Sequence, residues 1–177
     1  MALAALLAPM LFTPAQAEGG CGFEQAGKQQ GLIATCDQDT EKKEVILTGL
    51  LGPADLAQQP HFAENLAAYQ ADAAVISKLQ QIDVPTEIIV IMATWCPDCH
   101  RETPRLAKVI EQMNNPNIKV TYIGVDREKK DADGLAAKYD FTRIPTYIVQ
   151  QGEMELGRIV ESTKYSTELD LLDILHK

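Results

Sequence analysis

Two cysteines three residues apart carry the chemistry that this sequence most directly predicts. Cys96 and Cys99 lie in the run Trp95-Cys96-Pro97-Asp98-Cys99, between an apolar segment and a segment with helical periodicity. A cysteine at the start of a helix meets free backbone N–H groups and the positive end of the helix dipole, and both stabilise a thiolate. A second cysteine one turn later is within reach of the first. We therefore predict that Cys96 attacks a disulfide and that Cys99 resolves the mixed disulfide.

The segments around the two cysteines predict a sheet with crossover helices. The run from Glu87 to Ala93 is short, β-branched and continuously apolar, which is typical of a strand buried on both faces. The same kind of pattern predicts further strands at 45–49, 118–125, 145–150 and 154–160. Apolar spacing predicts helices at 61–81, from the cysteine motif to about 114, at 134–139 and at 166–176. This order indicates an α/β fold with a central mixed β-sheet and helices on both faces.

Three features in addition to the cysteine pair resemble the thioredoxin superfamily. Trp95 precedes the motif, Pro104 lies eight residues after Cys96, and Ile144-Pro145-Thr146 matches the family's cis-proline signature. The resemblance extends over roughly residues 62–177 and implies a thioredoxin-like fold in which Pro145 is cis and faces the cysteines. It also implies a thiol–disulfide oxidoreductase that exchanges electrons with protein thiols and disulfides and with a redox partner protein, without a cofactor or metal.

The sequence departs from the family around the second cysteine. Thioredoxins carry a buried Asp on the strand before the motif and a Lys on the next strand, whereas the matching positions here, Val90 and Tyr122, are uncharged. Candidates to replace that proton acceptor are Asp98, His100, Glu102 and Glu161. A solvated surface charge is the simpler interpretation of Glu102 and Glu161, whereas a cationic His100 would stabilise a Cys99 thiolate. Supporting roles at the site are expected for Trp95, Pro97, Asp98, His100, Pro104, Ile144, Pro145 and Glu161.

The N-terminal part of the sequence predicts export. Residues 2–12 are apolar and uncharged, and Ala15-Gln16-Ala17 fits the small-x-small cleavage site of a secretory signal, although no Lys or Arg precedes the apolar run. We predict a signal peptide at 1–17, an N-terminal extension at 18–60 and a thioredoxin-like domain at 61–177. The expected location is a bacterial periplasm, with no membrane span in the mature protein.

A second pair of cysteines lies in the predicted extension. Cys21 and Cys36 are separated by a Gly-rich segment without helical periodicity. In an oxidising compartment they are expected to form a structural disulfide, which would stabilise the fold by roughly 3 kcal/mol in the chain-entropy model. The alternative is a second redox pair that exchanges electrons with Cys96 and Cys99.

Composition and rival motifs limit the function further. The formal net charge of −9 argues against a nucleic-acid partner, because phosphate binding needs a basic surface. Cys96 to His100 also matches the C-x-x-C-H attachment motif of c-type haem, with His100 as an axial ligand. The four cysteines together would suit zinc, and a binding or chaperone module could keep the fold without the chemistry. A reductant is slightly favoured over an oxidant; substrate and oligomeric state do not follow from the sequence.

Overall fold

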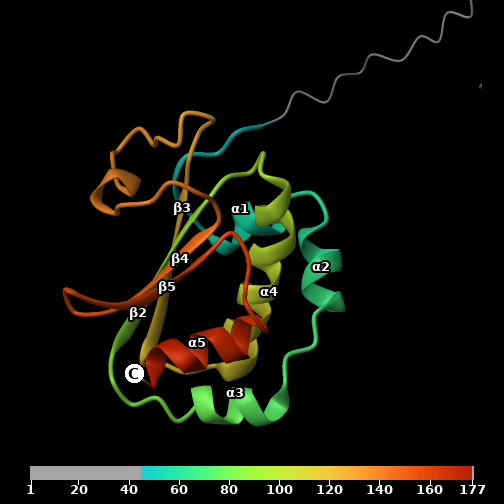
Figure 1. Ribbon diagram of the computed structural model, residues 1–177. Helices are drawn as coiled ribbons and strands as arrows, with labels where there is room; N and C mark the ends of the chain where they lie inside the picture. The colour runs from blue at the N-terminus through green and yellow to red at the C-terminus, as the bar shows by residue number, and fades with distance from the viewer. Residues whose placement is uncertain (1–44, 177) are drawn as a thin grey trace, which may run out of the picture. The chain divides into compact units, whose positions relative to one another are not determined.

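The computed structural model describes residues 45–176, so the predicted signal peptide at 1–17 and both Cys21 and Cys36 lie outside the described range. The strands are β1 (Gly49–Leu51), β2 (Thr86–Met92), β3 (Ile118–Gly124), β4 (Thr146–Gln151) and β5 (Met154–Val160) (Figure 1). The helices are α1 (Pro53–Ala57), α2 (Phe62–Ala68), α3 (Ala73–Leu79), α4 (Pro97–Met113) and α5 (Thr167–Leu175), with a short 3-10 turn, η1 (Ala136–Lys138). Among these described helices, none has both the length and the apolar character needed to cross a membrane.

The strands form one mixed sheet in the order β1-β3-β2-β4-β5. β2 and β3 run parallel, as a connection through α4 requires, whereas the other neighbouring pairs run antiparallel. β2 is central, and each residue from Ile88 to Met92 is at most 1% exposed. A continuously apolar sequence suits such a strand because both of its faces are covered. The predicted α/β fold, a central mixed sheet flanked by helices, is confirmed.

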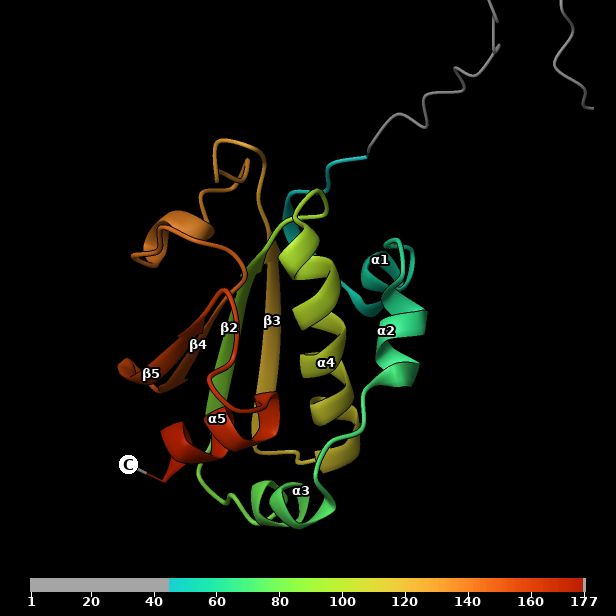
Figure 2. The same ribbon diagram turned by 45° about the vertical axis from the view of Figure 1, so that its right-hand side comes forward.

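Helix α4 lies on one side of the sheet and η1 on the other (Figures 1 and 2). The buried face of α4 carries Cys99, Leu106, Val109 and Met113 at three- and four-residue intervals, as an amphipathic helix requires. The helix also packs against α2, α3 and α5. These contacts fix the start of α4 at the C-terminal end of β2, where the two cysteines lie.

The helix predicted over 61–81 is interrupted, and the structure has α2 and α3 instead. The hydroxyl of Tyr69 donates to the carboxylate of Glu168 at 2.6 Å, and the backbone N–H of Asp72 donates to the same carboxylate at 3.0 Å. The Asp72 side chain then caps α3 by accepting from two backbone N–H groups. Contacts to α5 therefore override a helical periodicity that continues through the break.

Strand β1 lies within the predicted extension at 18–60, yet it belongs to the sheet. It pairs antiparallel with β3 and occupies one edge. The strand predicted at 45–49 is therefore displaced to Gly49–Leu51, and the sheet begins before residue 61, where the sequence had suggested the start of the domain.

The segment before β1 is bound to the loop that precedes Cys96. The Thr94 hydroxyl accepts from the Leu47 N–H at 3.3 Å and donates to the Val45 carbonyl at 3.0 Å. This segment also crosses close to β3, because a Cβ added at Gly124 would lie 2.6 Å from the Leu47 carbonyl oxygen. Glycine at position 124 allows that approach because it has no side chain. The segment that binds Thr94, in the loop before Cys96, can therefore lie directly against β3.

Candidate active site

Cys96 occupies the N-cap of α4, directly after the loop that follows β2. Its sulfur accepts a hydrogen bond from the Cys99 backbone N–H at 3.4 Å. Pro97 is the first helical residue, where its missing N–H costs nothing. Pro104 lies inside the helix. The site is thus assembled at a strand-to-helix junction, as the motif predicts.

Both thiols of the motif are free in the structure, and both are buried. Cys99 is fully buried and Cys96 is 6% exposed. We expected Cys96 to be the exposed thiol, and it is the more exposed of the two, but the Ile144 loop covers it. The Cys96 Sγ lies 3.7 Å from the Ile144 carbonyl oxygen, to which the protonated thiol donates.

The two thiols differ strongly in acidity. The hydrogen bond from the Cys99 thiol is the largest influence on Cys96, and with the backbone N–H groups of Cys99 and Asp98 it lowers the Cys96 pKa to about 6, against burial and the Asp98 charge, which raise it. The same thiol–thiol hydrogen bond, together with burial, raises the pKa of Cys99 far above its usual range. At neutral pH, therefore, Cys96 is mainly a thiolate and Cys99 a protonated thiol that stabilises it.

The cis-proline signature lies against this pair. The Ile144–Pro145 peptide bond is cis, and Pro145 is buried next to the start of β4. The Pro145 carbonyl accepts from the Glu161 N–H at 2.8 Å. A backbone so placed leaves the Ile144 carbonyl oxygen 3.7 Å from the Cys96 sulfur.

Trp95 and His100 both bind main-chain carbonyl groups around the motif. The Trp95 indole N–H donates to the Val125 carbonyl at 3.2 Å, and the Arg127 guanidinium stacks over the ring at 5.2 Å. His100 Nε2 lies 2.6 Å from the Thr94 carbonyl oxygen, so this nitrogen is the donor. Both rings thereby fix the loop that carries Cys96.

Charged side chains form a chain along α4 from the motif inward. Asp98 pairs with Arg101 at 2.9 Å, and the Oε1 atom of Glu102 accepts from Arg101 at 2.7 Å and from Arg105 at 3.1 Å. Glu102 is only 3% exposed. The interpretation of Glu102 as a solvated surface charge is therefore wrong, because two arginines cover one oxygen of the carboxylate and the protein core encloses the other.

Glu161 adopts a left-handed backbone conformation, with φ of 64°. The family resemblance places this residue near a position where thioredoxins have glycine, which adopts such a conformation at low cost. The Glu161 carboxylate pairs with Arg143 at 2.6 Å, and both side chains are substantially exposed. Glu161 therefore flanks the Pro145 loop through its backbone, while its charge is directed to Arg143.

Sequence reasoning did not identify Tyr147 and Thr103 as site residues. Tyr147 is 1% exposed and pairs across the sheet with Val90, which in turn pairs with Tyr122. Burial raises the Tyr147 pKa well above its usual value, and the charges of Glu102 and Cys99 add to that effect. The spacing of Thr103, four residues after Cys99, was the available signal, since such residues share a helix face.

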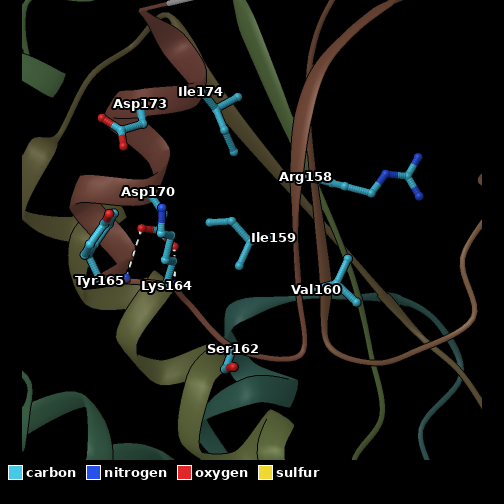
Figure 3. Close-up of a pocket in the computed structure, with 9 residues that line it drawn as sticks. All are labelled: Arg158, Ile159, Val160, Ser162, Lys164, Tyr165, Asp170, Asp173 and Ile174. Atoms are coloured by element: carbon cyan, nitrogen blue, oxygen red, sulfur yellow. Dashed lines mark hydrogen bonds between the residues drawn. The ribbon is translucent and has the colours of Figure 1, made fainter.

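A shallow pocket elsewhere lies between the end of β5 and α5 (Figure 3). The Asp170 carboxylate there accepts from the backbone N–H groups of Lys164 and Tyr165. These bonds hold the turn before α5 and include none of the residues around the two cysteines. Among residues 45–176, no three His, Cys, Asp or Glu side chains gather as the ligands of a metal ion would.

Comparison with known proteins places this arrangement in context. A family model described as thioredoxin matches residues 52–170, more than half of the chain. A thioredoxin H-type of Brassica campestris is 26% identical over 98 residues, covering 54% of this chain and 75% of the relative. A thioredoxin of Echinococcus granulosus is 34% identical over 68 residues, covering 38% and 58%. A crystal structure of a Pseudomonas aeruginosa protein of unknown function has 24% identity and a TM-score of 0.48, covering 66% and 78%.

The acidity of Cys96 can be measured by alkylation. In the fully reduced protein, the rate of iodoacetamide labelling at Cys96, assigned by peptide mass spectrometry, should show a midpoint near pH 6. Replacement Cys99→Ala should raise that midpoint because it removes the largest stabilising hydrogen bond. Cys99→Ser, which keeps a hydroxyl donor, is the matched control and should raise it less. A wild-type midpoint at the ordinary thiol value, about 8.5, would contradict the site geometry.

Proposed function

Because this chain belongs to the thioredoxin family, we propose that it is a thiol–disulfide oxidoreductase acting on protein disulfides through Cys96 and Cys99. The observation that carries the proposal is the placement of the Cys96 sulfur at the N-cap of α4, where it accepts from the Cys99 backbone N–H at 3.4 Å, with the Cys99 thiol buried one turn later. Only a thiolate attacks a disulfide efficiently, and only a nearby second thiol can release the trapped product. The site provides both.

The reaction proceeds by two displacements. The Cys96 thiolate attacks one sulfur of a substrate disulfide, which breaks that bond, forms a Cys96–substrate disulfide and releases the other substrate sulfur as a thiolate, which takes a proton from solvent. Cys99 then loses its proton and attacks Cys96 Sγ. The products are a Cys96–Cys99 disulfide and a second substrate thiol, so two electrons pass from the protein to the substrate.

The neighbouring backbone favours an extended polypeptide as substrate. The Ile144 carbonyl oxygen lies 3.7 Å from the Cys96 sulfur, and the Trp95 ring, with the Arg127 guanidinium stacked on it, directly precedes Cys96 in the chain. Backbone groups recognise an extended chain irrespective of its side chains. We therefore propose protein thiols and disulfides as substrates and a second protein as redox partner.

The c-type haem alternative requires His100 as an axial ligand. In this structure the His100 Nε2 atom lies 2.6 Å from the Thr94 carbonyl oxygen, and the Cys96 sulfur accepts from the Cys99 backbone N–H at 3.4 Å. These contacts favour the thiol–disulfide function. Proteins of both kinds would be exported, so the location of this protein does not distinguish the two functions. A Soret band in the purified protein would indicate the haem.

Substitution of each cysteine tests the assigned roles. The wild-type protein should accelerate the reduction of insulin disulfides by dithiothreitol. Cys96→Ser should abolish this acceleration, because the attacking sulfur is lost. Cys99→Ser should instead accumulate mixed disulfides with substrate proteins, visible on non-reducing gels, since attack remains but release is lost. Full insulin-reducing activity in Cys96→Ser would refute the proposal.

The direction of the reaction follows from how far the thiolate is stabilised. A Cys96 pKa of about 6 lies closer to the value near 7 of a reducing thioredoxin than to the value near 3.5 of a strong oxidant. We therefore propose a reductant. Equilibration with glutathione and dithiothreitol buffers, followed by counting of alkylated thiols, should place the Cys96–Cys99 pair near −270 mV, whereas about −120 mV would indicate an oxidant.

We also propose that the protein is exported to a bacterial periplasm. The support is the apolar run at 2–12 and the small-residue site ending at Ala17. Cell fractionation followed by N-terminal sequencing should recover a protein that begins at Glu18. Recovery of an uncleaved cytoplasmic protein would show that residues 1–17 are not a signal peptide.

A further inference from the structure

The backbone of the loop between β2 and α4 contacts the sulfur of Cys99. The Ala93 N–H donates to the Cys99 Sγ atom at 3.4 Å, and both residues are fully buried. The carbonyl of the same peptide group, which belongs to Met92, accepts from the Val125 N–H at 2.9 Å. The end of β3 therefore holds this peptide group by its oxygen, while its N–H points at the thiol that completes the reaction.

A hydrogen bond of this kind favours the thiolate over the thiol. A neutral sulfur is a weak acceptor, whereas an anion accepts a charge-assisted bond that is shorter and roughly twice as strong. The hydrogen bond to Cys96 and burial raise the pKa of Cys99, and the Ala93 N–H acts in the opposite direction. The bond from Ala93 therefore becomes stronger when Cys99 is the attacking thiolate.

Thr94 fixes the loop directly after this donor. Its hydroxyl accepts from the Leu47 N–H at 3.3 Å and donates to the Val45 carbonyl at 3.0 Å, so both its donor and its acceptor capacity are used. Its carbonyl oxygen accepts from His100 Nε2 at 2.6 Å. Thr94 is only 4% exposed. The hydroxyl thus joins the loop to the segment before β1, and the carbonyl joins the loop to α4.

The segment that binds Thr94 is itself fixed against the sheet. It leads into β1, whose three residues pair antiparallel with β3. A Cβ added at Gly124 would lie 2.6 Å from the Leu47 carbonyl oxygen, so the segment touches the backbone of β3. Gly124 directly precedes Val125, which orients the donor peptide group. Thr94 and that peptide group are therefore anchored to the same end of the same strand.

The two motif sulfurs depend on different parts of the backbone. The Cys96 sulfur accepts from the Cys99 N–H at 3.4 Å, and this donor belongs to α4 itself. The Cys99 sulfur accepts instead from Ala93, which belongs to the loop before the helix. A displacement of the loop should therefore affect the resolving thiol more than the attacking thiol.

We propose that the Ala93 N–H stabilises the Cys99 thiolate during resolution of the mixed disulfide, and that Thr94 is the positioning residue that holds this donor in place. The role rests on the redox function proposed above. In this step Cys99 gives its proton to solvent and its sulfur attacks Cys96 Sγ. The Cys96–Cys99 bond forms and the bond from Cys96 to the substrate breaks. The departing substrate sulfur leaves with the electron pair and takes a proton from solvent.

A chromogenic disulfide separates attack from resolution. When the reduced protein, in slight excess, reacts with dithiobis(nitrobenzoate), attack by Cys96 releases one coloured thiolate and resolution by Cys99 releases a second. A Cys96→Ser/Cys99→Ser protein, run in parallel, reports any release from Cys21 and Cys36, which is subtracted. The first phase then measures the attacking thiol, and the second phase measures the resolving thiol.

Thr94→Val removes the hydroxyl and keeps the branched shape of the side chain. We expect the second phase to slow by roughly tenfold, less than the loss of about a hundredfold on removal of a transition-state donor, because the Ala93 N–H is displaced and not lost. The first phase should stay unchanged, since the donor to Cys96 lies on α4. Thr94→Ser, which keeps the hydroxyl, should restore most of the rate. A merely structural hydroxyl would lower the urea unfolding midpoint and leave both rates as in the wild type.

Gly124→Ala tests the same linkage without a change in the loop. The added methyl group would meet the Leu47 carbonyl oxygen at 2.6 Å, so the segment that binds Thr94 must move, and we expect the same selective slowing of the second phase. Gly52→Ala is the matched control and should leave both phases unchanged, because its φ is negative and its Cβ would lie 3.6 Å from the nearest atom, a carboxylate oxygen of Asp55. Should Gly124→Ala not fold, the two Thr94 variants decide.

A second phase in Thr94→Val with the wild-type rate would overturn the inference. Equal slowing of both phases would overturn it as well, because the loop would then act on both thiols alike, and so would a Thr94→Ser protein as slow as Thr94→Val. Absence of the first phase in the wild-type protein would instead refute the proposed redox function. The two failures are therefore distinguishable in one trace.

Discussion

Burial of the Cys99 thiol is the constraint on which the rest of the site depends. A protonated thiol in the core can donate to Cys96, and this bond is the largest influence that lowers the Cys96 pKa to about 6. The start of α4 adds backbone N–H groups from Cys99 and Asp98 to the same sulfur. The same burial that activates the first cysteine makes the second hard to deprotonate. A fold that positions one thiol for attack therefore also needs a means of removing a proton from the core.

Local patterns predicted the parts of the fold that are determined locally. The β-branched run of β2, the strand-to-helix junction at Cys96 and the helical face of α4 follow from spacing and residue type, because neighbouring residues fix them. The interruption between α2 and α3 could not be predicted in this way. It depends on Glu168, which lies 99 residues after Tyr69 and binds it at 2.6 Å.

Charge was the weakest guide to position. Glutamate is a residue type that is mostly exposed, and only the three-residue spacing of Glu102 from Cys99 indicated a buried place. Two arginines on its own helix satisfy one of its oxygens and so make the burial of the other acceptable. Tyr147 offered even less, because a tyrosine in an apolar strand is an ordinary core residue. Its place opposite Val90, on the strand that leads to the cysteine motif, emerges only when β4 is paired with β2.

The two edges of the sheet have a consequence for the handling of other polypeptides. β1 spans three residues, and β5 has a register shift against β4 and carries the ion pair of Glu155 with Arg158. Short, irregular and charged edges resist strand-to-strand aggregation. Both edges of the sheet are therefore poorly suited to pairing with a strand of another polypeptide.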